Sequence, residues 1–469
     1  MLEKQNDNRR EVTIIDIDRL VPKDHLVRKI EKVMEYEWIY KMVEPYYCLN
    51  NGRPGTDPVV LIKMVLIQHL FGISSLRKTV KEIDVNIAYR WFLGYGFLDN
   101  IPHFATISYN FCNRFPPELY EEIFKRILNK AINNRMVDTS IIFIDGTHIK
   151  ASANNKKRQK EQVAKTAKIY EEQLHAEINA DREEHGKKPF NDDNNTPPEM
   201  KEVTVSTTDP DCGVFRKGEH KTEFAYEAHT ACDKNGFIIG VEVTAGNVHD
   251  SIAFDAVYEK ATAIISEAEI IAADSAYKTP WICKRILDDG RIPSMPYKRP
   301  MGKDGFYRPW EYKYDIVTDS VICPNGQAMK YSTTNRDGYR EYKSNAKECV
   351  NCDWRTMCTT SKSCQKTVQR HLWAEYVEIA EDIRKTDLGK SSYILRSQTI
   401  KRVFADAKEK HAMRYTQHRG LPNVTNWVKL KFACMNLKKL STWSWDIFDN
   451  LTFWLYFRFY TARTRISCF

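Results

Sequence analysis

The sequence lacks both an apolar leader at its start and an apolar stretch long enough to span a membrane. Its opening residues, MLEKQNDNRREVTI, are polar and contain no apolar core of the kind found in secretory signals. The most apolar stretch near its end, residues 445–460, is interrupted by groups that a bilayer span would exclude, namely Asp446, Asp449, Asn450 and Arg458. We therefore expect a cytoplasmic chain without a membrane partner, in which the twelve cysteines are reduced thiols or metal ligands.

The sequence also lacks an internal repeat. Apolar residues make up 42% and charged residues 28%, which is typical of a globular protein rather than a disordered one. With 469 residues, the chain is long enough for two or three domains. Its formal net charge of +9 favours a polyanionic partner such as nucleic acid, although the same charge could serve solubility alone.

Residues 1–137 are expected to form a helical module. The apolar run 58–72 follows the turn sequence NGRPGTDP and is too short for a membrane span, so we predict a buried helix. Short helices with Arg and Lys on their polar sides follow, in ISSLRKTVKEI and HFATISYNFCNRF. This arrangement is typical of a helix-turn-helix-like DNA-binding domain. Ordinary solvated helices show the same pattern, so the sequence leaves both interpretations open.

Residues 138–300 alternate between strand and helix signals and predict a mixed α/β sheet with helices on its faces. The run IIFID, from residue 141, is typical of a strand buried on both faces. Two further strands, FAYEAHTACD and FIIGVEVTAG, flank the hairpin turn Lys-Asn-Gly, and EIIAAD is another buried strand. Residues 155–200 interrupt this pattern with a Lys- and Glu-rich segment, which we predict to be an exposed helical excursion ending in a linker at 190–200.

Two aspartates stand at the carboxyl ends of apolar strands. Asp145 follows Ile-Ile-Phe-Ile, and Asp274 follows Ile-Ile-Ala-Ala. If the two strands are parallel neighbours, both side chains project into one crevice, where open α/β sheets bind ligands. Paired carboxylates are ligands for Mg²⁺ or Mn²⁺, and two such ions can promote phosphodiester displacement. The alternative is that each aspartate only ends its strand and caps the following turn.

The segment GNVHDS follows a strand and opens the next helix. Asp250, with Ser251 beside it, is the expected N-cap of that helix. For His249 the sequence leaves two roles open, a structural one and a supporting one at the metal crevice or on a DNA phosphate.

Residues 301–375 form a polar, cysteine-rich insertion. One CxxC pair, Cys349 and Cys352, and two flanking cysteines, Cys323 and Cys358, could bind Zn²⁺ through four thiolates. Reduced structural cysteines explain the pattern equally well, since only one CxxC is present. The Tyr, Arg and Lys side chains of KYSTTNRDGYREYKSNAK suit contact with a DNA backbone, and they equally suit a solvated loop.

Residues 376–443 return to helical patterns and are expected to complete the α/β domain. Ile400, Val403, Phe404 and Ala407 recur at helical spacing, which predicts one face packed on a core. Residues 444–469 are expected to form an aromatic tail.

Several blocks of the sequence resemble, in order, the signature blocks of bacterial insertion-sequence transposases of the DDE class. The resemblance covers residues 15–443 and implies a ribonuclease-H-like catalytic domain that cuts and joins DNA at element ends with two Mg²⁺ ions. It also implies a helical N-terminal DNA-binding domain, double-stranded DNA as the partner, and a homo-oligomer assembled on paired DNA ends in the bacterial cytoplasm. The blocks are IDGTHIKASAN, TAGNVHDS, IAADSAYKTP, YKRP and RSQTIKRVFADAKEKHAMRYTQHRGLPNVTNWVKLKFACMNLKKL.

The resemblance makes Asp145 and Asp274 the first two catalytic carboxylates. It places the third in the family string Arg-Ser-Gln-Thr-Ile-Glu-Arg-Val-Phe. Here Lys401 stands where that glutamate is expected. A lysine ammonium has only donors and repels Mg²⁺, so this departure predicts weak or absent activity.

Neighbouring residues of the same helix also match the family pattern. Tyr393 and Arg396 precede the lysine and Lys408 follows it, all at positions that imply supporting roles. Glu409 is the nearest glutamate, but it lies roughly 12 Å further along the helix axis, and Asp406 points to another face. Glu409 as the true third ligand therefore remains an alternative.

These observations leave three alternative functions open. The chain is an active transposase, a non-catalytic DNA-binding remnant of one, or a nuclease of the same fold that only hydrolyses.

Overall fold

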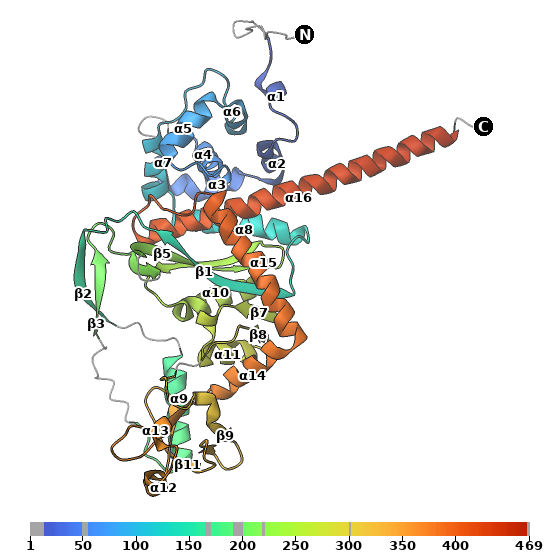
Figure 1. Ribbon diagram of the computed structural model, residues 1–469. Coiled ribbons are helices and arrows are strands. Elements are labelled where there is room, and N and C mark those ends of the chain that lie inside the picture. The colour runs from blue at the N-terminus through green and yellow to red at the C-terminus, as the bar shows by residue number, and fades with distance from the viewer. Residues whose placement is uncertain are drawn as a thin grey trace, which may run out of the picture.

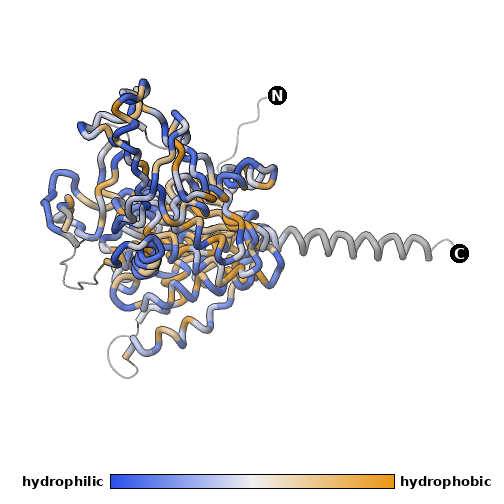
Figure 2. Tube along the Cα trace, turned by 90° about the horizontal axis from the view of Figure 1, so that it is seen from below, coloured by the Kyte–Doolittle hydropathy of each residue, from blue (hydrophilic) through white to orange (hydrophobic). Residues whose placement is uncertain are grey.

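The computed structural model describes residues 14–48, 55–164, 170–190, 200–217, 221–299 and 302–466. Figure 1 shows three parts in space: N-terminal helices, a central sheet, and a smaller sheet at the far end, with two long C-terminal helices crossing the first two parts. Hydrophobic residues gather in the middle of the molecule and hydrophilic ones at its periphery (Figure 2).

The N-terminal part of the described chain is helical, as the sequence predicts. Helix α4 lies at its centre and is buried on nearly all sides, because almost every residue from Val59 to Leu70 is apolar. Asp57 caps α4, and Pro58 fills the first helical position, where its missing N–H costs nothing. The helices are α1 (Ile17–Leu20), α2 (Leu26–Val33), α3 (Glu37–Val43), η1 (Glu44–Tyr46), α4 (Pro58–Leu70), α5 (Leu76–Val85), α6 (Ile87–Leu93), α7 (Phe104–Tyr109), η2 (Asn110–Arg114) and α8 (Pro117–Asn133).

The central sheet is the mixed sheet that the sequence predicts, with strand order β4-β5-β1-β7-β8 and β6 paired to β5. β1 runs antiparallel to β5 and parallel to β7, which in turn runs parallel to β8. The first four residues of β1 are all buried, because helices cover both faces. The strands are β1 (Ile141–Lys150), β4 (Gly213–Lys217), β5 (Lys221–Cys232), β6 (Ile238–Ala245), β7 (Ile270–Ala273) and β8 (Ile292–Ser294).

Three helices pack on this sheet. α10 (Asp250–Ile264) contacts β1, β5 and β6, whereas α15 (Asp387–Glu409) contacts β1, β7 and β8 through its predicted apolar stripe. α16 (Leu421–Ile466) contacts β6 and also α2, α4 and α8, so it joins the sheet to the N-terminal helices (Figure 1). α11 (Pro280–Asp288) and α14 (Ala374–Lys385) pack on each other beside β8.

The predicted helical excursion at 155–200 is correct only in part. β2 (Arg158–Ala164) is a strand that pairs with β3 (Met200–Ser206). Its charged residues serve cross-strand pairs such as Lys160 with Glu202, 2.7 Å apart, rather than pairs one helical turn apart. Among the described residues of this segment, α9 (Glu171–Glu184) alone is helical, and it is not fully exposed. Most of the predicted linker, residues 191–199, lies outside the described part of the chain.

The cysteine-rich segment forms an antiparallel sheet of order β13-β12-β11-β10-β9 with its own small core around Met329 and Tyr342. α9 docks on it, since Asp181 forms an ion pair with Arg340 and Arg182 donates to Thr333. α9 and the insertion therefore form one body, visible at the bottom of Figure 1, whereas β2 and β3 form a separate hairpin-like pair beside the central sheet. Its elements are η4 (Pro309–Glu311), β9 (Lys313–Asp315), β10 (Ser320–Ile322), β11 (Ala328–Thr334), β12 (Tyr339–Lys343), α12 (Ala346–Val350), α13 (Arg355–Cys358) and β13 (Thr367–His371).

The predicted aromatic tail belongs to α16, which continues as one helix to Ile466. The side chains from residue 446 onward lie outside the described part of the structure. Among the helices that were described, none is long and apolar enough to cross a bilayer.

Candidate active site

Asp145 and Asp274 lie side by side because their strands are parallel neighbours. Ile144 of β1 is paired with Ala273 of β7, so the residues that follow them stand at the same level of the sheet. Asp274 also caps the short helix η3 (Ser275–Tyr277) by accepting a hydrogen bond from the Ser275 N–H. Asp274 therefore caps the turn that follows its strand and also lies beside Asp145, so both interpretations of this residue hold.

Arg396 of α15 bridges the two aspartates. Its Nη2 lies 2.7 Å from Oδ2 of Asp145 and 3.6 Å from Oδ2 of Asp274, and its side chain is only 1% exposed. Within the described residues, its Nε and Nη2 atoms have no hydrogen-bond partner. The guanidinium is thus a buried positive charge held between the two carboxylates. The Tyr393 ring lies 5.7 Å from this guanidinium.

Burial raises the pKa of Asp145 to about 6, because a charged carboxylate is poorly solvated there. The nearby charge of Arg396 opposes this rise in pKa, and that of Asp274 adds to it. The positive charge of Lys401 also lowers the pKa of Asp145, which places its ammonium within electrostatic reach of the aspartate pair.

Glu409, the alternative third ligand, is directed elsewhere. It ends α15, its side chain is 61% exposed, and it forms an ion pair with Arg414. The other carboxylates of α15 have basic partners too, as Asp406 is paired with Lys410 at 2.8 Å and Asp387 with Lys390 at 3.9 Å.

The N-terminus of α10 differs from its prediction. His249, not Asp250, is the N-cap, and its Nδ1 accepts hydrogen bonds from the backbone and the hydroxyl of Ser251. The imidazole ring acts here as a short polar acceptor, a role that the usual capping preferences give to Asp. Asp250 is thereby the first residue of the helix, and its carboxylate is free to turn toward the sheet.

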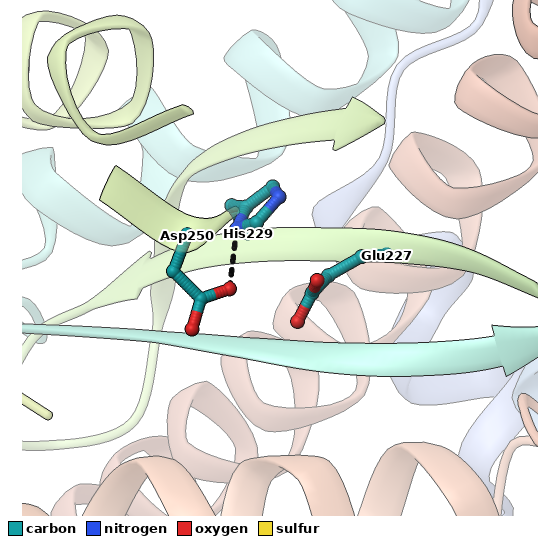
Figure 3. A group of neighbouring side chains, drawn as sticks. All are labelled: Glu227, His229 and Asp250. Carbon is teal, nitrogen blue, oxygen red and sulfur yellow. Dashed lines mark ion pairs between the residues drawn. The ribbon is translucent and has the colours of Figure 1, made fainter. Parts of the chain in front are cut away.

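Asp250 meets two residues of β5, Glu227 and His229, in a group that the sequence did not reveal. One ligand atom from each residue lies within 4.8 Å of the others, and Figure 3 shows the two carboxyl groups beside the imidazole. The alternation Glu-Ala-His in a strand could have indicated that Glu227 and His229 share a face. Nothing in the sequence indicated that α10 places Asp250 there.

This group lies on the face of β1 opposite to Asp145. Cross-strand partners share a face, and His229 is paired with Gly146, whereas Asp145 is paired with Thr230. A methyl group on Gly146 would stand 2.5 Å from Oε1 of Glu227, so only glycine leaves room for the group. Burial, followed by the charge of Asp250, raises the pKa of Glu227 to about 9, and the charge of Lys408 lowers it.

The four predicted zinc ligands line one cavity of about 40 Å³ in the insertion. Cys349 donates to the Ser344 hydroxyl at 3.2 Å, and the sulfur of Cys358 lies 3.1 Å from the Tyr312 hydroxyl. Among the described residues these sulfur atoms do not form a group as tight as that of Glu227, His229 and Asp250.

Comparison with known families gives three matches. Residues 15–113 match a transposase domain (DUF772), and residues 201–376 and 322–441 match two models that are each described as a transposase DDE domain. The two DDE matches overlap and run from residue 201 to residue 441, a range that contains Asp274, Arg396 and Lys401 but not Asp145. No curated protein matches the chain.

Proposed function

Because the chain belongs to the DDE transposase family, whose members are polynucleotidyl transferases that depend on a divalent metal and act on DNA, we propose that Asp145 and Asp274 hold the catalytic cation. Two carboxylates are hard oxygen ligands, which suits Mg²⁺ or Mn²⁺. The parallel pairing of β1 and β7 supports this assignment. It places Asp145, which lies outside the range matched by the DDE models, beside Asp274, which lies inside it. When bound, such a cation activates the attacking oxygen and stabilises the leaving oxygen.

The protein's own groups position the DNA at this crevice. Arg396 holds Asp145 in place and balances the charge of both aspartates. A separate basic groove between α15 and α16 has a volume of about 670 Å³ and lysine or arginine at five lining positions. These are Lys234, Arg402, Lys410, Lys438 and Lys439. The groove, like the helical N-terminal domain, suits the backbone of double-stranded DNA bound by two or more protomers.

We further propose that Lys401 makes this copy a weak or inactive enzyme that retains DNA binding. The observation that carries the proposal is the contrast on α15: Lys401 lies little more than one helical turn after Arg396, which contacts both aspartates, whereas Glu409 is exposed and paired with Arg414. An ammonium at the third-carboxylate position supplies no ligand and repels the cation. A chain with that defect would still recognise DNA through its helical domain and the groove.

The test replaces Lys401 by glutamate. Cleavage and joining are measured with Mg²⁺ or Mn²⁺ on plasmid DNA that carries the sequences flanking the gene. We expect Lys401→Glu to cut on the order of 100-fold faster than the wild type, since even groups that only support a metal ligand contribute 10- to 100-fold. DNA affinity should change much less than cleavage.

Two control variants complete the test. Lys390→Glu makes the same charge reversal at an exposed position of the same helix, away from the aspartates and outside the groove, and should not raise cleavage. Lys401→Glu combined with Asp145→Asn should be inactive. Equal cleavage by wild type and Lys401→Glu would show that the third ligand has been assigned wrongly, and cleavage without joining would identify a hydrolysing nuclease.

For the insertion we propose structural Zn²⁺ bound by Cys323, Cys349, Cys352 and Cys358. Their common cavity supports it, and a thiolate site would draw the four sulfur atoms together. The alternative, reduced structural thiols, is supported by the hydrogen bonds that Cys349 and Cys358 make with neighbouring hydroxyls.

A further inference from the structure

His229 presents a bare imidazole nitrogen to Asp250. The side chain of His229 is fully buried, and burial disfavours a charged ring. The Thr244 hydroxyl donates to the Ala245 carbonyl, so it accepts a hydrogen bond from Nε2 of His229 at 3.0 Å. The ring proton is therefore on Nε2, and Nδ1 carries a lone pair.

That lone pair faces a carboxylate. Nδ1 lies 3.7 Å from Oδ1 of Asp250, and the Tyr277 hydroxyl, at 3.4 Å, is too far to make a strong hydrogen bond. Glu227, from the same strand as His229, brings a second carboxyl group against Asp250 (Figure 3), and its Oε2 also lies 3.3 Å from Nε2 of His148. Three electron-pair donors converge here in a largely buried place, which is costly unless a cation or a proton lies between them.

We infer that Glu227, His229 and Asp250 bind a divalent transition-metal ion, in a site separate from the aspartate pair. Two ligands of one cation at about 2.1 Å are roughly 3 to 3.5 Å apart, so the observed spacing needs only small side-chain rotations. A nitrogen ligand with two carboxylates suits Mn²⁺ or Zn²⁺ better than Mg²⁺, which prefers oxygen. Asp250 is one-quarter exposed and gives the ion a path from solvent.

Two features of the surrounding structure fit this site. Thr244 fixes the tautomer of His229 by accepting from Nε2, as outer partners of metal-bound histidines do. Gly146 keeps the space between the ligands open, because a side chain there would collide with Glu227. In the absence of a metal, a proton shared by Glu227 and Asp250 relieves their repulsion, and metal binding releases that proton.

The test uses Mn²⁺ alone with the full chain. Pulsed electron paramagnetic resonance of bound Mn²⁺ should show ¹⁴N coupling from an imidazole, a signal that the all-oxygen site at Asp145 and Asp274 cannot give. Glu227→Gln should weaken the nitrogen-coupled Mn²⁺ at least roughly tenfold, while its amide still donates to Asp250 and preserves the packing. Glu242→Gln is the matched control, a glutamate of β6 that stands opposite His229 in the sheet but is paired with Lys260.

Asp274→Asn separates this inference from the proposed function. The variant removes a ligand of the proposed catalytic site and should abolish any cleavage, yet it should keep the nitrogen-coupled Mn²⁺. Absence of ¹⁴N coupling in the wild-type chain would overturn the inference, and so would equal binding by Glu227→Gln and Glu242→Gln.

Discussion

Arg396 is the residue on which the electrostatics of the candidate active site depend. It is buried, and its partners are the two aspartates that the proposed function assigns to metal binding. Without a metal, the guanidinium is the cation that balances both carboxylates. Removing it would leave Asp145 and Asp274 close together without a positive charge between them, and breaking a buried ion pair is strongly destabilising.

We predict that Arg396→Gln lowers the free energy of unfolding by about 3 kcal/mol and makes that free energy depend on metal. Mg²⁺ or Mn²⁺ should restore part of the lost stability, because the cation replaces the missing charge. Urea unfolding in chelator and in excess metal measures both effects. Arg370→Gln is the control, since Arg370 pairs with the exposed Glu378. Equal losses of unfolding free energy in Arg396→Gln and Arg370→Gln, or no recovery of that free energy with metal, would contradict the charge-balancing role of Arg396.

The two aspartates could be predicted from the sequence, but most of their surroundings could not. Each aspartate directly follows an apolar strand, and parallel pairing then suffices to bring the two together. Arg396 reaches them only because α15 lies across β1 and β7, a tertiary fact that no local pattern contains. The group around His229 also depends on tertiary packing, because it brings residues of β5 together with Asp250 in the first turn of α10.

At the level of elements, β2 and α9 show why one charged segment can form two structures. β2 contains Arg158, Lys160 and Glu161, α9 is rich in Glu, and the sequence predicted one helix for the whole charged segment. β2 is a strand because β3 provides partners for its backbone and for Lys160. α9 remains a helix because Leu174 and Ile178 recur at helical spacing and pack with Trp373. Distant partners decided between strand and helix, and periodicity alone could not identify them.

The insertion supplies a prediction about metal content. If zinc is bound, the purified full chain contains about one zinc per molecule, measured by elemental analysis. Cys349→Ser combined with Cys352→Ser should remove it and lower the melting temperature of the insertion. Cys364→Ser should retain the zinc, because Cys364 is in the same segment but does not line the cavity. A zinc-free wild-type chain with no difference between these variants would identify the cysteines as structural thiols.

At the scale of the whole molecule, α16 holds the N-terminal helices against the catalytic sheet, and Lys431 stands at their junction. Its ammonium is buried and donates to the His411 carbonyl at 2.5 Å, while Nδ1 of His69 from α4 lies 3.3 Å away. Nδ1 of His411 in turn lies 2.8 Å from the carbonyl oxygen of His69. Burial lowers the pKa of Lys431 from 10.5 to about 7, because a buried ammonium loses its hydration.

This junction should make the stability of the whole molecule depend on pH. Because the pKa of Lys431 is lower in the folded chain, the unfolded chain holds one more proton between about pH 7 and 10. Stability therefore rises with pH through that window and falls as the pH returns to 7. From pH 7 to pH 9 the wild type should gain about 2 kcal/mol relative to Lys431→Met. Urea unfolding of both chains at each pH measures this difference. Because the other titrating groups are the same in both chains, their contributions to the pH dependence cancel. Lys410→Met, at an exposed lysine, should behave as the wild type does. Parallel pH profiles for wild type and Lys431→Met would mean that Lys431 keeps its ordinary pKa at the junction.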